Sequence, residues 1–578
     1  MQTTTAVRSL LFSGLFLFPP VLNGDNCFIT ARPASEVAPA VFTLNGEERL
    51  YVYCTQDIIN GSGVYPVDTI HCYSTTDMFH WRDEGVCLSE RDVPWAVQAT
   101  HKLWAAHVAQ FNCHVSRDSI VILYRLAAAE DSSDGYFHIF TAMSSTPAGP
   151  FTAGPPLPGM VKDVIDPFIF IDQENTTLSV WMSYRHQDTR SLGLVRMDDS
   201  ASSITGDINK ALVNVGPGAP SGYMEGSCMI KRGDYYFLFY SLAPGSGNEM
   251  IAYSTSKTRD GPWTYRGKVM SPNPSEYTIH PGVCEFKGRW YLFYHNVTFG
   301  GSLFGTCRSP GVEYLYFAND STVDTGGLSK TNRGVGVPRA GSDTIQADRG
   351  VVTGARVKAI PYSSSGTEQT GWYIDSINDG ATVQYDSVDF TPAAGNRIGT
   401  VFARIASNDS AGAVGLHLDS AAGLLLGTIP VDTTGSLAKW KTTDSIPLIA
   451  SPPAGVHNLV LVLKTSAPKS YTLNWIGFGE IPEDAVLDRK IAAGRSRCTL
   501  QRIGRDRFNL LGLEDAKTAR IRIFNLTGRE IPGVALARRL DAHAAAVTLL
   551  PGRLSTGVYI VSIADRNRNY GMRMQIYP

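Results

Sequence analysis

The sequence predicts an all-β protein, in which a five-bladed β-propeller precedes a β-sandwich of the jelly-roll type and a small C-terminal β-sandwich. Short aromatic strand cores recur along the first half of the chain. Turn-forming residues are frequent, with 55 Gly and 32 Pro among 578 residues, and long helical patterns are scarce. Many short strands at a regular period are typical of propeller blades.

The repeated strand cores give the number of blades. They end at Tyr53 (LYVY), Tyr124 (VILY), Tyr184 (VWMSY), Tyr240 (FLFY) and Tyr294 (YLFY). The steps between them are 71, 60, 56 and 54 residues, which is enough for several strands each. We therefore expect five blades within residues 25–330. A large β-sandwich with similar strands is the alternative, although sandwiches rarely repeat at such a period.

Two further regions follow the repeats. Residues 345–480 carry alternating strands such as VQYDSVDF and LVLVLK, and their length suits one sandwich. Residues 489–578 contain the strand patterns ARIRIFNL and GVYIVSI, with seventeen Lys or Arg against six Asp or Glu. This basic excess either binds anionic surface polymers or is solvated charge.

The N-terminus reads as a signal peptide over residues 1–24. Arg8 precedes an apolar run from Leu10 to Phe18 that is too short to span a bilayer, and we expect cleavage near Gly24. No later segment is long and apolar enough for a transmembrane helix, so we expect a secreted or cell-surface protein. The formal net charge of -2 argues against a nucleic-acid partner.

The nine cysteines form no CxxC pair and no zinc-type spacing, which argues against a zinc site. In an exported protein one or two disulfides are plausible, and buried thiols within strands are the alternative.

Two acidic residues precede apolar strands. Asp166 stands in DVIDPFIFID and Glu225 in GYMEGSCMI. Hydrolysis of a glycosidic bond needs a protonated acid for the leaving oxygen and a base for water. Burial beside apolar residues is expected to raise the pKa of Glu225, and Asp166 could tune and orient that acid. An Asp before Pro is also a common turn residue.

Segments from about Pro33 to Asp324 resemble glycoside hydrolase family 43. They include DMFHWRDEG, LWAAH, DVIDPFIFID, YMEGSCMIKRGDYYFLFYS and IHPGVCEFKGRWYLFYHN. The resemblance implies a five-bladed propeller that hydrolyses O-glycosyl bonds in plant cell-wall hemicellulose with inversion, as an arabinofuranosidase or xylosidase. The resemblance also implies that the hydrolysis requires no cofactor.

The same resemblance assigns roles by position. Asp166 matches the family's pKa-tuning Asp and Glu225 its catalytic acid. His280 matches a central histidine that lies under the sugar and often touches a bound calcium, so a structural calcium in the propeller centre is implied there. Arg308 matches an arginine that holds substrate, and Trp104 an aromatic residue lining the pocket.

The chain departs from the family at the base. The matching segment reads VAPAVFTLNGEERLYVY, which places Ala38 at the position of the usual Asp, and His107 replaces another usual acid. Either a neighbour such as Glu36, Asp68 or His107 activates the water, or the protein binds glycan without cleaving it. A propeller glycosidase acting on galactan or fructan is a third reading.

Residues 345–480 resemble carbohydrate-binding module family 6, through IQADRG, GWYIDSINDG, TTGSLAKWKT and YTLNWIGFGE. The resemblance implies that Tyr373 and Trp440 stack on a sugar ring, while Thr472 stands where the family has a binding Asn. Trp440 and Trp475 could instead belong to the core.

The C-terminal region, through IFNLTGREI and LSTGVYIVSI, is similar to sorting domains of type IX secretion, which implies contact with an export machinery.

Overall fold

The structure, a computed structural model, describes residues 21–576 apart from a set of internal segments. These segments are residues 24–25, 60–64, 97–101, 117–118, 127–128, 131–132, 175–176, 188, 207–214, 273–277, 301–306, 327, 329–330, 361–370, 411, 468, 484–498, 503–506, 512–519, 526–534, 540–543, 550–556 and 566–567. The all-β prediction is confirmed, because the named elements are strands apart from three single-turn 3-10 helices. None of the helices in the described part of the chain is long and apolar enough to cross a membrane.

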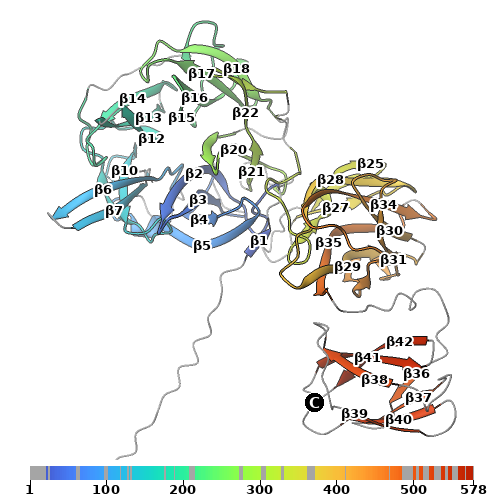
Figure 1. Cartoon of the computed structure of the whole chain (residues 1–578). Helices are drawn as coiled ribbons and strands as arrows, with labels where there is room; N and C mark the ends of the chain where they lie inside the picture. The colour runs from blue at the N-terminus through green and yellow to red at the C-terminus, as the bar shows by residue number, and fades with distance from the viewer. Residues whose placement is uncertain are drawn as a thin grey trace, which may run out of the picture. The chain divides into compact units, whose positions relative to one another are not determined.

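Five antiparallel sheets follow one another around a common centre, from blue to green in Figure 1. The first has the strand order β1 (Val21–Asn23), β5 (His80–Ser89), β4 (Val67–Thr75), β3 (Glu47–Asp57), β2 (Ser35–Leu44). The second has the order β11 (Thr152–Pro156), β10 (Phe140–Ser144), β7 (Ser119–Leu126), β6 (Ala109–Ser116). The prediction of five blades is confirmed.

The third blade contains β12 (Val164–Glu174), β13 (Thr177–His186) and β14 (Leu192–Met197). The fourth contains β15 (Cys228–Arg232), β16 (Tyr235–Leu242), β17 (Met250–Ser256) and β18 (Thr264–Met270). The fifth contains β19 (Gly282–Phe286), β20 (Arg289–Asn296) and β21 (Ser309–Tyr314). Two short hairpins accompany the blades, β8 (Ala129–Glu130) with β9 (Phe137–His138), and β22 (Tyr316–Asn319) with β23 (Thr322–Asp324).

The aromatic strand cores lie between blades, and β16 shows why they recur. Alternate residues of a strand point to opposite faces of its sheet. Phe237 and Phe239 join the core shared with Leu292 of the fifth blade, while Leu238 and Leu242 join the core on the side of the third blade. A central strand of a blade is therefore buried on both faces, which requires a nearly continuous run of large apolar residues.

The ring closes between the first and fifth blades through hydrogen bonds of the segment before β2. Phe28 N donates to Pro310 O at 3.2 Å, and Ala34 N donates to Arg308 O at 2.8 Å. Asn26 Nδ2 donates to Glu313 Oε1 at 3.0 Å. These contacts tie the start of the propeller to its last blade.

Strand β1 lies inside the predicted signal peptide and pairs with β5. Cleavage near Gly24 would remove this edge strand and leave a first blade of four strands, as in the second and fourth blades. Five of the cysteines that the structure describes, Cys54, Cys72, Cys87, Cys228 and Cys284, are free thiols, and the disulfide expectation is not met among these five. Cys113 and Cys498 fall outside the residues whose side chains are described.

The second region forms two facing sheets. The seven-stranded sheet has the order β26 (Arg356–Ile360), β27 (Gly371–Asp375), β35 (Tyr471–Pro482), β29 (Asn396–Ser407), β32 (Ser436–Thr442), with β24 (Thr344–Gln346) and β33 (Ile446–Pro447) as additions. The five-stranded sheet has the order β25 (Val351–Thr353), β28 (Ala381–Asp389), β34 (Val456–Thr465), β30 (Gly412–Leu418), β31 (Leu425–Val431). A single apolar core, which includes Val383, Val401, Leu461 and Ile476, lies between them. The predicted sandwich is confirmed.

The C-terminal region consists of two small antiparallel sheets. One contains β36 (Thr499–Arg502), β37 (Arg507–Leu511), β40 (Ala544–Leu549) and β39 (Ala535–Arg539). The other contains β38 (Arg520–Asn525), β41 (Gly557–Asp565) and β42 (Arg568–Ile576). On β38, Arg522 is exposed and Ile523 is buried, as alternation along a strand requires.

Candidate active site

An axial cavity opens where the innermost strands of the five blades begin. It is lined by Glu36, Val37, Ala38, Pro39, Ala105, Ala106, His107, Asp166, Pro167, Phe168, Gly226, Ser227, His280, Pro281 and Gly282. Every blade therefore contributes residues at the start of, or just before, its innermost strand. This convergence brings together side chains that lie far apart in the sequence.

Asp166 and His280 line this cavity, and Glu225, which is not among the lining residues, forms a polar cluster with them. His280 Nε2 lies 3.0 Å from Glu225 Oε1 and 3.9 Å from Asp166 Oδ2. The backbone N–H of Gly226 donates to Asp166 Oδ2 at 3.2 Å. The Glu225 side chain is 16% exposed, against 5% for Asp166 and 9% for His280. Glu225 is therefore the member of the cluster most accessible to a substrate.

Gly226 leaves the space that His280 needs to reach Glu225. Its φ is +61°, and a Cβ added there would lie 2.7 Å from the His280 ring. Any side chain at position 226 would push His280 away from Glu225. The contact between His280 and Glu225 thus explains why a glycine follows the glutamate in the sequence MEGS.

The charges of the cluster differ from the expectation for Glu225. Burial acts to raise its pKa, but the hydrogen bond from His280 and the positive charges of His280 and Arg185 outweigh burial and lower it. Burial raises the pKa of Asp166, and the neighbouring Glu225 carboxylate adds to this shift. Burial acts to lower the pKa of His280, but the two carboxylates prevail and raise it to about 10. In the free site Glu225 is thus ionised, and the prediction of a raised pKa is wrong because it could not include His280.

Arg185 is a site residue that the sequence analysis missed. It lies on β13, directly opposite Ile165, which precedes Asp166. Its Nη1 is 3.6 Å from Glu225 Oε2, and its side chain is only 8% exposed. The sequence does contain a signal for Arg185, because an arginine stands next to the end of the apolar central strand β13. The neighbouring strand β12 carries Asp166 close to this end.

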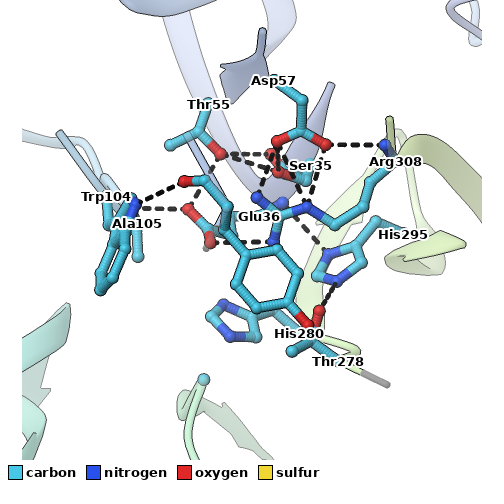
Figure 2. Close-up of polar contacts among 12 residues, drawn as sticks. Ser35, Glu36, Thr55, Asp57, Trp104, Ala105, Thr278, His280, His295 and Arg308 are labelled. Carbon is cyan, nitrogen blue, oxygen red and sulfur yellow. Dashed lines mark hydrogen bonds and ion pairs between the residues drawn. The ribbon is translucent and has the colours of Figure 1, made fainter. Parts of the chain in front are cut away.

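Glu36 is another ionisable group that lines the cavity, and its carboxylate is held from three sides (Figure 2). Arg308 Nη1 donates to Oε1 at 3.1 Å. Thr55 Oγ1 and the backbone N–H of Ala105 donate to Oε2 at 2.9 and 2.8 Å. Glu36 N donates to His295 Nδ1 at 3.1 Å. Blades one, two and five therefore fix this side chain.

The guanidinium of Arg308 is bound by two protein carboxylates, Asp57 and Glu36. Nη2 and Nε donate to Asp57 at 2.7 and 3.0 Å, and Arg308 is 2% exposed. Burial works against its charge, and the carboxylates of Asp57 and Glu36 outweigh it and raise the pKa of Arg308. Arg308, expected to hold substrate, is thus placed to hold Glu36.

Trp104 flanks this group without lining the axial cavity. Its Nε1 donates to Tyr65 O at 2.9 Å, and its ring stacks on Phe137 with centroids 4.8 Å apart. The following residue, Ala105, binds Glu36 (Figure 2). Trp104 is half-buried.

The other expected substitutes for the base are less suited. His107 Nδ1 accepts a hydrogen bond from Ile169 N, and burial lowers the pKa of His107 to about 3, so it is a poor proton acceptor. Asp68 is not among the described residues that line the cavity. Ala38 lines it but carries no functional group. Because Glu36 supplies a carboxylate to the same cavity, the alanine at position 38 does not by itself mean that the site lacks a base.

The residues present do not by themselves fit the implied calcium ion. Asp166, Glu225 and His280 place one ligand atom each within 4.8 Å of one another. Calcium takes six to eight oxygen ligands, whereas this set offers two carboxylates and a ring nitrogen. That nitrogen is also bound to Glu225.

The aromatic pair in the second region has an unexpected arrangement. Tyr373 of β27 and Trp440 of β32 meet edge to face, with centroids 5.5 Å apart and planes at 77°. A sugar cannot enter between rings that touch, so these residues offer an angled platform rather than a sandwich. Thr472 is buried and donates to Ala406 O, so it does not replace the family's binding Asn. Trp475 packs edge to face on Phe402.

Comparison with known proteins follows the same division of the chain. Residues 35–323 match the model of glycosyl hydrolases family 43, and residues 356–480 match that of carbohydrate binding module family 6. An arabinoxylan arabinofuranohydrolase of Paenibacillus polymyxa is 25% identical over 466 residues, which cover 72% of this chain and 67% of that protein. The enzyme of the same name from Bacillus subtilis (strain 168) is 24% identical over 486 residues, covering 73% and 86%. A xylosidase/arabinosidase of Bacteroides ovatus is 26% identical over 295 residues, covering 45% and 85%. The propeller and its cavity thus have the family's sequence pattern, and the chain belongs to family 43 of the glycosyl hydrolases.

Proposed function

We propose that this glycoside hydrolase releases arabinofuranosyl or xylosyl groups from plant hemicellulose with inversion at the anomeric carbon. The observation that carries the proposal is the placement of Glu225. It is the most exposed of the three clustered groups at the propeller axis, and it lies between His280 and Arg185. The names of the similar proteins, arabinoxylan arabinofuranohydrolase and xylosidase/arabinosidase, support the choice of sugar.

Glu225 acts as the general acid in this proposal. It must carry a proton when the bond to the leaving oxygen breaks. In the free site the proton resides on His280, whose Nε2 lies 3.0 Å from Glu225 Oε1. A bound sugar that excludes water removes solvation from the Glu225 carboxylate and favours its neutral form. Transfer of the His280 proton across this contact then loads the acid.

Asp166 tunes this exchange and does not contact the leaving group. It is 5% exposed and is fixed by Gly226 N, the amide that follows Glu225. Burial raises the pKa of Asp166, so it tends to be neutral while Glu225 is charged. When Glu225 becomes neutral, Asp166 can ionise more easily, because two adjacent carboxyl groups avoid being charged together. The reaction itself needs water and protein carboxyl groups and requires no cofactor.

The second region supplies glycan binding in this proposal. Tyr373 and Trp440 present an angled aromatic surface on the seven-stranded sheet, with Lys358 Nζ 5.8 Å from the centre of the Tyr373 ring. Sugar C–H faces stack on aromatic rings, so one ring face is sufficient for a weak contact. The module would then keep the propeller near a polysaccharide.

We further propose that the protein is exported by its signal peptide and works outside the cell or at its surface. The sequence pattern of residues 1–24 supports export. The motifs IFNLTGREI and LSTGVYIVSI support contact between the C-terminal region and an export machinery.

The activity is tested with the purified chain lacking residues 1–24, the form expected after removal of the signal peptide. Aryl α-L-arabinofuranoside, aryl β-D-xyloside and arabinoxylan serve as substrates, and proton NMR records the anomer formed first. Release of arabinose or xylose with inverted configuration is expected. Retained configuration refutes the inverting mechanism, and absence of release from all three refutes the proposed specificity.

A further inference from the structure

We propose that Glu36 is the general base of this enzyme, displaced by two residues from Ala38, where the family pattern expects the base. The inference rests on the proposed hydrolytic function and identifies the group that activates water in it. It is carried by a structural repeat between the first and third blades, and by the hydrogen bonds that hold the Glu36 carboxylate.

The repeat is a bulge at the start of two innermost strands. On β2, Ser35 pairs with Thr55 and Ala38 with Tyr53, and the register shifts between them. On β12, Ile165 pairs with Arg185 and Phe168 with Ser183, and the register shifts in the same way. Each bulge thus places two residues opposite one on the neighbouring strand.

The backbone within the two bulges is also alike. Glu36 has φ +51° and Asp166 has φ +54°, values in the left-handed region that non-glycine residues rarely adopt. By strand pairing, Glu36 is therefore the counterpart of Asp166, and Ala38 is the counterpart of Phe168. Both carboxylates line the same axial cavity. An alignment of the sequence to the family through Ala38-Pro39 places the base at Ala38, which follows the bulge. The strand pairing places it at Glu36, within the bulge.

The hydrogen bonds leave Glu36 able to accept a proton. A carboxylate offers about four acceptor positions. Thr55 and Ala105 occupy two on Oε2, and Arg308 occupies one on Oε1. No further donor to Oε1 is present among the described residues, so one position is left there for a water molecule. The three donors also prevent the side chain from rotating, so the acceptor stays in place between turnovers.

In the proposed step Glu36 takes up one proton and Glu225 gives up another. The water oxygen forms a bond to the anomeric carbon while Glu36 takes a proton from that water. The bond from the anomeric carbon to the leaving oxygen breaks, and this oxygen takes the proton of Glu225. Attack and departure on opposite sides of the carbon invert its configuration.

The test compares Glu36→Ala, Glu36→Gln and Ala38→Asp with wild type on an aryl arabinofuranoside and an aryl xyloside. Asp172→Asn serves as the matched control, because Asp172 is also a buried carboxylate and is not among the described residues that line the cavity. Loss of a general base typically reduces the rate about 10²–10⁴-fold. We expect this loss in kcat for both Glu36 variants, with little change for Asp172→Asn and no gain for Ala38→Asp. Thermal unfolding identifies any variant that loses its fold, and Glu36→Gln keeps the volume if Glu36→Ala does not fold.

Azide separates a catalytic role from a structural one. Azide attacks the anomeric carbon without needing a base, so it should restore turnover of Glu36→Ala and yield a glycosyl azide of inverted configuration. A folded Glu36→Ala enzyme with wild-type kcat overturns the inference, as does a loss that azide and formate leave unchanged while Ala38→Asp gains activity. If wild type itself cleaves neither substrate, the proposed function fails. If wild type is active and Glu36→Ala equally so, only the role of Glu36 fails.

Discussion

Replacing Asp57 by Asn should weaken the propeller at the place where its ring closes. Asp57 lies at the end of β3 in the first blade, and Arg308 precedes β21 in the fifth. The Asp57 side chain is 0% exposed and the Arg308 side chain 2%. Asp57 accepts hydrogen bonds from Arg308 N, Nε and Nη2, at 2.6, 3.0 and 2.7 Å, and from Ser35 Oγ at 3.2 Å. The substitution keeps the shape but removes the charge opposite a buried guanidinium.

The size of the effect follows from burial. Removing one partner of a buried ion pair typically costs about 3–5 kcal/mol, because the other charge is left without compensation. Arg308 keeps Glu36, which accepts from Nη1 at 3.1 Å, so we expect the lower end, about 3 kcal/mol. For a domain of this size that corresponds to a fall in Tm on the order of 5–10 °C.

Asp172→Asn is the matched control. Asp172 is an equally buried carboxylate, but its cationic partners Lys231 and Arg259 are 34% and 24% exposed. Solvent can compensate these cations, so the expected loss is about 1 kcal/mol. Urea unfolding followed by tryptophan fluorescence measures both variants, and kcat is recorded at the same pH. Asp57→Asn should also lower kcat because Arg308 positions Glu36. A loss for Asp57→Asn no larger than that for Asp172→Asn would refute the assignment of this pair to ring closure.

Three further outcomes test other parts of the molecule. Glu225→Gln should lose about 10²–10⁴-fold in kcat on arabinoxylan and far less on a nitrophenyl glycoside, which needs little protonation; equal losses on both contradict an acid role. Burial raises the pKa of Glu313 from 4.5 to about 7, so the stability that this group contributes is full below pH 4.5 and is lost as the pH rises through 7. Wild type should therefore lose stability relative to Glu313→Gln over that pH interval. If the free energy of unfolding depends on pH in the same way for both proteins, the raised pKa of Glu313 is contradicted. Tyr373→Ala and Trp440→Ala should each weaken arabinoxylan binding in affinity electrophoresis by about 1 kcal/mol, and less than additively together, because their rings touch. Full additivity would mean that they bind sugar independently.

The blades could be predicted from sequence because their central strands have a local signature. A strand such as β16, buried against two neighbouring blades, must be apolar at almost every position, and that pattern is visible without knowledge of any partner. Asp166, Glu225 and His280 could also be selected, since each stands in a motif next to such a strand. In the structure, one ligand atom of each of the three lies within 4.8 Å of the others.

What could not be predicted depends on contacts between blades. The direction of the Glu225 pKa shift is set by His280 and Arg185, which lie 55 and 40 residues away in the sequence. The role of Arg308 is set by Asp57, 251 residues earlier in the chain. A sequence motif reports the environment of its own strand, whereas these effects depend on the strand that the fold places opposite. The bulge at Glu36 is hidden for the same reason, because a register shift is defined only by its partner strand.

The position of Glu36 links the closure of the ring to the chemistry. Its carboxylate receives hydrogen bonds from Thr55 in the first blade, Ala105 before the second and Arg308 in the fifth. The contacts that close the propeller between its first and last blades therefore also hold the proposed base. A displacement at this seam moves Glu36 relative to Asp166 and Glu225, which are held by the third and fourth blades. Inversion requires the base and the acid to remain about 6.5–9.5 Å apart with water between them. Variants that loosen the seam should thus lose kcat before they lose the fold, and a series of seam substitutions should show kcat falling at temperatures well below Tm.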